Sequence, residues 1–256
     1  SSSEQQEVNH TIRELQQCLI LMKNEHVTSA EEFHNALSQP VFLPYQDGYQ
    51  LAYFRVDNIH HLYETKLRDH AALKKHLQDL LQESIPRRMD YTLIFISNHS
   101  GVLLFQSKEK LRVRNICHSI IRNIAQYLNL NVSITLSDLL LDIEAFATTF
   151  AQLLEAHDVR FYEGDGCLIQ SEQQRSFYDL NINELTYHTD ILEAVQAKDF
   201  STAAQLLQQA METMRSLFIQ PHQVKDYFVF IFNNIEGNEI IKGTRQAFPV
   251  HAMAKT

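Results

Sequence analysis

The chain has 256 residues, enough for one large domain or two smaller ones, and its 45% of hydrophobic residues can bury a core. Asp and Glu outnumber Lys and Arg by 31 to 22, which argues against a broad nucleic-acid-binding face. No apolar run of the sequence reaches the roughly 18 residues of a membrane-spanning helix, so we expect no direct membrane contact. Three cysteines without CxxC spacing argue against disulfides and cysteine zinc sites, and favour a cytoplasmic protein.

The first segment, residues 1–47, is expected to be a helical signalling segment. The chain begins at Ser-Ser-Ser without Met, and we expect it to be part of a longer protein. Apolar residues at steps of four and three form an a/d seam of about two heptads. Two interpretations stay open: a seam that pairs two chains in a homodimer, or an amphipathic helix packed on its own domain. The seam residues are Val8, Ile12, Leu15, Leu19 and Met22.

The second segment, residues 48–170, is expected to be an α+β domain. Short apolar runs predict strands at 49–56, 91–96, 102–105, 131–136 and 167–169, with residues 97–101 as a five-residue hairpin connector. Helical spacing predicts helices at about 60–85 and at 108–128, the latter with Leu111 on its buried face. A further helix, capped by Ser137 or Asp138, is expected to run to about residue 157. The first six elements follow the β-α-β-β-α-β order of ferredoxin-like and palm-type domains.

The third segment, residues 171–235, is expected to be a small helical module. One apolar stripe runs from Phe200 to Leu217, and another follows Pro221. The second stripe is aromatic and apolar on more than one side, which predicts that it meets a partner surface. Residues 236–256 contain Gly and Pro with weak periodicity, and we expect a loose tail or a linker to a missing domain.

Particular residues of the second segment resemble the GGDEF nucleotide-cyclase family. FRVDNI, residues 54–59, is similar to the first strand of that family and puts Asp57 at the position of its first metal-binding aspartate. Residues 151–169 resemble its closing helix and strand. Arg87 to Asp90 is similar, with looser spacing, to the RxxD inhibitory motif that precedes the signature hairpin. The resemblance implies a GGDEF-like, palm-type sheet.

The chain departs from the family where the chemistry would occur. In place of the Gly-Gly-Asp/Glu-Glu-Phe signature it has Ser97-Asn98-His99-Ser100-Gly101, and no carboxylate lies between Asp90 and Glu109. A palm-type cyclase needs carboxylates from both the first strand and the hairpin to hold two Mg²⁺ ions. We therefore expect no enzyme activity, no catalytic or metal-binding residue and no cofactor.

The wider arrangement resembles the central region of AraC/XylS-type transcriptional regulators of the response-regulator or membrane-receptor kind. The resemblance rests on the degenerate GGDEF-like domain, on Glu31-Glu32-Phe33 before it, and on Ala-Lys-Asp-Phe at residues 197–200 after it. It implies a two-component or receptor-linked signalling role. The partners would be a second copy and a C-terminal helix-turn-helix domain, absent here, through which alone the protein would bind DNA.

A second hypothesis is that the abandoned cyclase cleft still binds a nucleotide, cyclic di-GMP or GTP. The candidate ligand-binding residues are Asp57, Arg87, Asp90 and His99. His99 on the hairpin and Asp57 could share a cleft. The basic residues around Lys110 could bind a phosphate at a helix N-terminus, or form an ordinary solvated helix face. The remaining histidines are scattered, and Cys117 is expected to be a core thiol.

Overall fold

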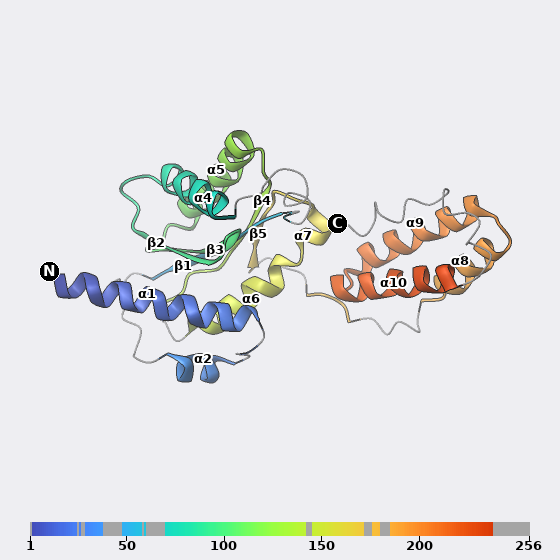
Figure 1. The fold of residues 1–256 in the computed structure, drawn as a ribbon, viewed down its shortest axis with the longest axis horizontal. Coiled ribbons are helices and arrows are strands. Elements are labelled where there is room, and N and C mark those ends of the chain that lie inside the picture. Colours follow the sequence, from blue (N-terminus) through green and yellow to red (C-terminus); the bar gives the residue numbers. More distant parts are fainter. Residues whose placement is uncertain are drawn as a thin grey trace. The chain divides into compact units, whose positions relative to one another are not determined.

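The computed structural model describes residues 2–24, 26, 29–37, 48–57, 59, 70–141, 145–171, 176–179 and 185–237. It divides into two compact units, Ser1–Gln174 and Arg175–Thr256. The first contains a β-sheet with helices on both faces, and the second contains three helices (Figure 1). The predicted helix start at residues 60–69 and nearly all of the predicted tail lie outside the described residues.

The sheet of the first unit has five strands in the order β2-β3-β1-β4-β5. β1 runs antiparallel to both β3 and β4, β2 runs antiparallel to β3, and β5 pairs in parallel with β4. This order confirms the predicted α+β fold with its ferredoxin-like, palm-type sheet. The strands are β1 (Gln50–Val56), β2 (Tyr91–Ser97), β3 (Ser100–Phe105), β4 (Val132–Leu136) and β5 (Leu168–Gln170).

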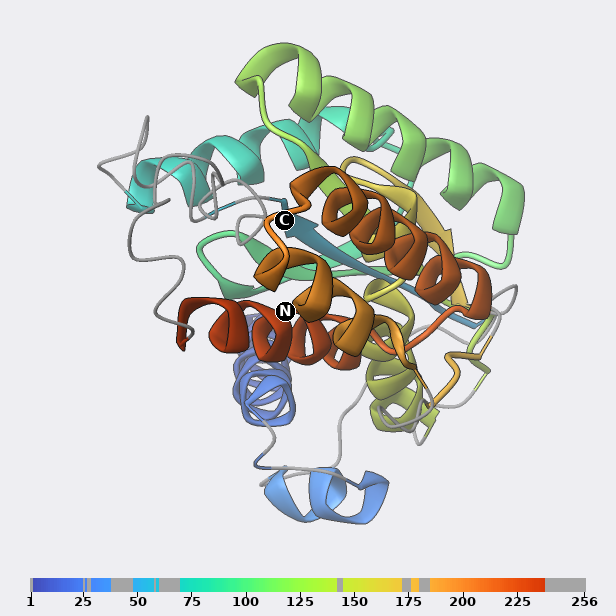
Figure 2. The same ribbon diagram turned by 90° about the vertical axis from the view of Figure 1, so that its right-hand side faces the viewer.

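The two faces of the sheet are covered by different helices. Helices α4 (His70–Ser84) and α5 (Lys110–Leu128) pack on one face, where β1 contributes Ala52, Phe54 and Val56 to a continuous core (Figure 2). Helices α1 (Ser2–Lys23), α2 (Ala30–Ala36) and α6 (Phe146–His157) lie on the opposite side of the sheet, and the core there contains Leu51 and Tyr53. Alternate residues of β1 therefore serve opposite cores, as the two-residue period of a strand requires.

The buried stripe of α5 follows the predicted helical spacing with one exception. Val113, Ile116, Cys117, Ile120 and Ile124 are buried, and the helix ends at Asn129 in the left-handed conformation. Leu111 was expected on this face, but its side chain is 69% exposed. Because successive helical residues are rotated by about 100°, Leu111 lies on nearly the opposite side of the helix from Val113.

The N-terminal helix α1 packs on its own sheet. Leu15, Leu19 and Met22 are buried in the core that also contains Ile94, Ile96 and Val102 of the hairpin. Ile12 packs against the edge of the same core, and the side chain of Val8 lies outside the described part of the chain. Leu15, Leu19 and Met22 are therefore covered by the chain itself, as the interpretation of an amphipathic helix packed on its own domain predicts, and the pairing of two chains stays a prediction.

Two local predictions were wrong. The hairpin connector is shorter than expected: only Asn98 and His99 lie between β2 and β3, because hydroxyls at Ser97 and Ser100 hydrogen-bond each other and extend the pairing. Ser137 and Asp138 do not begin a helix. The amide of Ser137 donates to the Leu51 carbonyl, and residue 140 pairs with Tyr49, so this segment continues alongside β1.

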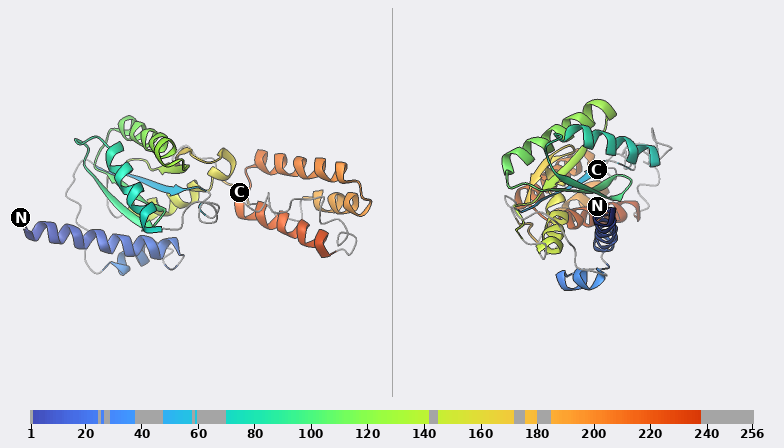
Figure 3. Two further views of the ribbon diagram at one scale, coloured as in Figure 1. Left: turned by 45° about the horizontal axis from the view of Figure 1, so that its top comes forward. Right: turned by 90° about the vertical axis from the view of Figure 1, so that its left-hand side faces the viewer.

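The second unit contains α8 (Tyr187–Gln196), α9 (Phe200–Leu217) and α10 (Pro221–Gly237) (Figure 3). The predicted stripes are present in α9 and α10, whereas α8 was not predicted. Asp199 caps α9 by accepting from the Thr202 amide, and Phe218 ends it in the left-handed conformation. On α10, Tyr227 and Ile231 are buried. None of the helices in the described ranges is long and apolar enough to span a membrane.

Gly101 is the position where the sheet admits no side chain. It lies opposite Phe54 and Phe95 in the two neighbouring strands, and a Cβ atom there would stand 2.5 Å from the Ile94 carbonyl oxygen and 2.8 Å from Cζ of Phe54. We expect Gly101→Ala to lower the free energy of unfolding by about 1–3 kcal/mol, because the backbone must move to relieve these contacts. Urea unfolding followed by circular dichroism measures the change.

The control for this prediction is Gln126→Ala on the exposed face of α5, for which we expect a change of less than about 0.5 kcal/mol. Equal midpoints for Gly101→Ala and the unchanged protein would show that the β2–β3–β1 sheet is not packed as described.

Candidate functional site

A row of polar side chains crosses the sheet at the end of β1. The strand register places Ser97 opposite Ser100, Ser100 opposite Arg55, and Arg55 opposite Ser133. Directly opposed residues share one face of a sheet, and Arg55 follows Tyr53 at the two-residue period, so the row lies on the α1 and α6 face. Ser100 and Ser133 are fully buried. This combination of burial and polarity marks the row as the candidate site.

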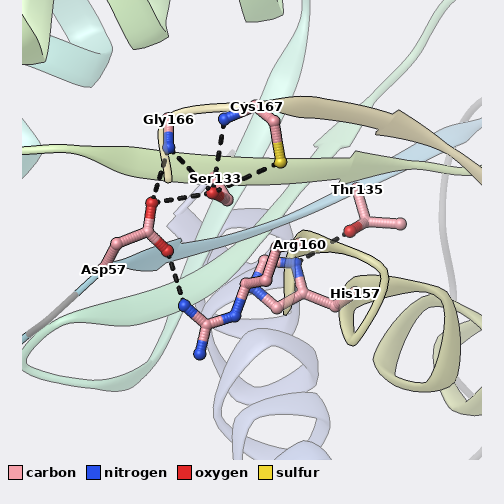
Figure 4. A network of polar contacts seen from close by, with 7 residues as sticks. All are labelled: Asp57, Ser133, Thr135, His157, Arg160, Gly166 and Cys167. Carbon is pink, nitrogen blue, oxygen red and sulfur yellow. Dashed lines mark hydrogen bonds and ion pairs between the residues drawn. The ribbon is translucent and has the colours of Figure 1, made fainter. Parts of the chain in front are cut away.

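Asp57 is at the centre of the hydrogen-bond network at one end of the row (Figure 4). Its side chain is fully buried, and Nη1 of Arg160 donates to Oδ1 at 2.7 Å. The hydroxyl of Ser133 and the amide of Gly166 donate to Oδ2 at 2.7 and 2.8 Å. The amides of Gly166 and Cys167 also donate to Ser133 Oγ. Both carboxylate oxygens are therefore occupied by donors from the chain itself.

The donors to Asp57 come from segments that lie far along the chain. Ser133 is on β4, Arg160 begins α7 (Arg160–Glu163), and Gly166 lies in the turn before β5 with a positive φ of 70°. The guanidinium and the two further donors occupy three of the roughly four lone-pair positions of this carboxylate. In this geometry Asp57 joins β1 to β4, α7 and the turn before β5.

His157 extends the network along α6. Its Nδ1 lies 2.8 Å from Thr135 Oγ1, and its ring packs edge-on against Tyr53 with centroids 4.8 Å apart. Burial, with the nearby charges of Arg160 and Arg55, lowers the pKa of His157 from 6.5 to about 3. The imidazole is therefore neutral at pH 7. Its Nε2 is buried without a hydrogen-bond partner among the described residues.

Two further cations lie along the row, Arg55 between Ser100 and Ser133 and Lys23 next to Ser100. Lys23, in the last turn of α1, donates to Ser100 Oγ at 3.2 Å. Arg55 is half-buried, and its Nε has no hydrogen-bond partner within the described ranges. Burial and the charge of Arg55 lower the pKa of Lys23, which means that the two cations lie close enough to repel. This part of the row is electropositive, whereas Asp57 neutralises Arg160 at one end of it.

The structure does not bring the four predicted ligand residues together. Asp57 and His99 lie at the same end of the sheet, since the Val56 amide donates to the His99 carbonyl, but the Asp57 carboxylate binds Arg160, Ser133 and Gly166. Arg87 and Asp90 are exposed and come just before β2. The first residue of β2, Tyr91, pairs with Phe105 of β3, and Phe105 pairs with Gln50 at the start of β1, so Arg87 and Asp90 lie near the opposite end of the sheet. A seven-residue strand, about 23 Å long, separates the two ends.

The comparisons with known proteins are limited to structural likeness. No protein-family model and no curated protein matches this sequence. Among solved structures, the active GGEEF domain of a diguanylate cyclase from Vibrio cholerae is 12% identical with a TM-score of 0.43, covering 49% of this chain and 84% of that one. At such identity and TM-score, the likeness says nothing about ligands or activity of this chain.

Two structures of the Vibrio cholerae LapD S helix-GGDEF-EAL region are also similar. The form bound to c-di-GMP is 20% identical with a TM-score of 0.40, and the apo form is 17% identical with a TM-score of 0.39. Each match covers 60% of this chain and 36% of the LapD chain, so this chain spans about a third of the length of those relatives.

The cysteines and acidic residues offer no second site. Burial raises the pKa of Cys117 to about 12, as befits the core thiol that was predicted. Burial also raises the pKa of Cys167, so its thiol next to Ser133 is a poor nucleophile at pH 7. Among the residues that the structure describes, no group of three or more His, Cys, Asp or Glu side chains could hold a metal ion.

Because the buried Asp57 forms an ion pair with Arg160, we expect the substitution Asp57→Asn to lower the stability of the protein strongly. Asp57→Asn keeps the size of the side chain but leaves the guanidinium, which is only 24% exposed, without its counter-charge. We expect the free energy of unfolding to fall by about 3 kcal/mol. Urea unfolding at pH 7 measures it.

Asp138→Asn is the matched control, because the pair of Asp138 with Lys110 lies on the surface with both side chains about half exposed. Its expected loss is below about 1 kcal/mol. Similar losses for the two variants would refute the structural role of Asp57.

The lowered pKa of His157 predicts that the free energy of unfolding depends on pH. The unfolded chain binds a proton on this histidine near its ordinary pKa of 6.5, and the folded chain does so only near pH 3. The unfolded state therefore gains protons first as the pH falls, and the stability present above pH 6.5 is lost progressively toward pH 3. Between pH 7 and pH 5 the loss from this residue is about 2 kcal/mol.

The measurement compares unfolding free energies at pH 7 and pH 5 for the unchanged protein and for His157→Gln, which should show a flatter slope. His118→Gln, on the exposed side of α5, serves as the control and should keep the original slope. If His157→Gln retained the full slope, the buried neutral histidine would be ruled out.

Proposed function

We propose that this chain is the non-catalytic, signal-transmitting region of a bacterial AraC-type transcriptional regulator. In this role it couples an upstream signal to a DNA-binding domain outside these residues. The observation that carries the proposal is the state of Asp57: its carboxylate is held by Arg160, Ser133 and Gly166, and the hairpin offers no second carboxylate. A two-metal phosphoryl transfer needs several free carboxylates at one place, and residues 91–108, which contain the hairpin, carry none.

The contacts of α1 support a transmitting role. Besides its apolar contacts, the helix touches the hairpin through two polar bonds: Gln16 Nε2 donates to the Phe95 carbonyl at 2.8 Å, and Lys23 donates to Ser100. A displacement of α1 by an upstream event would break or shift these bonds and alter the hairpin end of the sheet. A homodimer remains part of the proposal, and it would form through a surface other than the covered side chains Leu15, Leu19 and Met22.

A domain that binds cyclic di-GMP or GTP is the second candidate. It is favoured by one observation, the half-buried cations Lys23 and Arg55 beside the hairpin, because cations in a partly dry place attract phosphates. The predicted pair Arg87 and Asp90 is exposed at the opposite end of the sheet and would not contribute to the same ligand contact.

Incubation with GTP and Mg²⁺ tests the absence of catalysis. We expect no cyclic di-GMP by liquid chromatography, since the hairpin carries no carboxylate that could hold the ions together with Asp57. Product formation above the level of a buffer blank would contradict the proposal. Calorimetric titration with GTP and with cyclic di-GMP separates the two candidates, because stoichiometric binding of either nucleotide would favour the second.

Two further measurements address the regulator itself. The sequence that follows residue 256 in the full-length protein should encode two helix-turn-helix motifs, and an unrelated domain there would contradict the AraC assignment. Sedimentation equilibrium should give the molar mass of a dimer, and a strict monomer over the accessible concentration range would remove the homodimer from the proposal.

A further inference from the structure

Lys23 and Arg55 form a pair of like charges that no acidic side chain of the described residues compensates. Both side chains are half-buried. Lys23 Nζ has the Ser100 hydroxyl as its hydrogen-bond partner, and Arg55 Nε is buried without a partner in the described ranges. Neither residue takes part in an ion pair with the residues that the structure describes, although the whole chain has 31 acidic residues against 22 basic ones.

Two half-buried cations close to each other lower the stability of the folded protein. A cation that loses part of its hydration without gaining a counter-charge is destabilised, and two such cations near each other add a repulsive energy. The repulsion shows in the lowered pKa of Lys23, for which burial is the first cause and Arg55 the second. The nearby carboxylate Asp57 does not relieve it, because that group binds Arg160.

We propose that Lys23 and Arg55 bind the phosphate group of a small anionic ligand. The register places Arg55 directly opposite Ser100 on β3, and Lys23 reaches the same hydroxyl from α1. The Ser97 hydroxyl lies 2.7 Å from that of Ser100. A phosphate carries up to two negative charges and several acceptor oxygens, so it can neutralise both cations, whereas a carboxylate carries one charge.

Binding there would connect three elements: α1, β1 and the β2–β3 hairpin. The ligand would replace the repulsion between Lys23 and Arg55 by two attractions, and would hold the C-terminal end of α1 on the sheet. The inference deepens the second candidate function by naming the atoms that contact phosphate, and it does not require the AraC assignment. It also gives the transmitting role an input, since the position of α1 would depend on ligand.

The test is a titration of the whole chain with inorganic phosphate, followed by backbone amide NMR at constant ionic strength set with potassium chloride. We expect saturable shifts at Arg55 and Ser100. Arg55→Gln should weaken the affinity about tenfold or more, because it removes one charge-assisted contact. Lys75→Glu, on the exposed side of α4 and away from this face, should leave the affinity unchanged. Shifts that do not saturate, or the same affinity for Arg55→Gln, would overturn the proposal.

A second variant separates loss of binding from loss of folding. Lys23→Glu puts a carboxylate next to Arg55, so it should abolish phosphate binding while the melting temperature stays the same or rises. A Lys23→Glu protein that binds phosphate as the unchanged chain does would overturn the proposal.

Titrations with guanosine monophosphate and guanosine distinguish the sources of the phosphate. Tighter binding of the monophosphate than of inorganic phosphate identifies a nucleotide, and equal affinity identifies free phosphate. Binding of guanosine as tight as that of its monophosphate would overturn the role of the phosphate contact. These results are separable from the turnover and helix-turn-helix tests, which do not depend on Lys23.

Discussion

The bond between Asp57 and Arg160 organises the end of the sheet. It joins residues 103 positions apart in the sequence, and the same carboxylate also holds Ser133 of β4 and the turn before β5. The buried charge would be costly without these donors, so the closing segment of the domain is fixed where the first strand ends. The positions of α7 and of the turn before β5 relative to β1 depend on this carboxylate.

Near its end, β1 places apolar and polar side chains on opposite faces of the sheet. Ala52, Phe54 and Val56 build the core under α4 and α5, while Arg55 alternates with them and points to the other face. A change of a polar residue at the end of β1 therefore leaves the main core untouched. The polar residues still contribute to stability, because Asp57 joins the end of β1 to β4, α7 and the turn before β5.

Most of the fold of the first unit was predictable from the sequence, and most of the site was not. Strands and helices follow from local periodicity, which a single strand such as residues 50–56 displays on its own. The network needs Ser133, Arg160 and Gly166 in one place, and only the strand register brings them together. Ser133, between the apolar residues Val132 and Ile134, was a weak indication that this strand carries a polar side chain on one face. Nothing in the sequence around Arg160 indicated that it would contact Asp57. The helix α1 could not be assigned because apolar spacing is the same for a dimer seam and for docking on a sheet.

The contact between Gln16 and the Phe95 carbonyl bears on the pairing of the sheet edge with other chains. β2 is the outermost strand on its side of the sheet, and its register shifts between Phe95 and Ser97. An outer strand with open carbonyls is a template for edge-to-edge aggregation. Here an amide side chain from α1 takes one of those carbonyls and the irregular register interrupts the ladder. The first helix thus leaves this outer strand with one carbonyl fewer for pairing with a second chain.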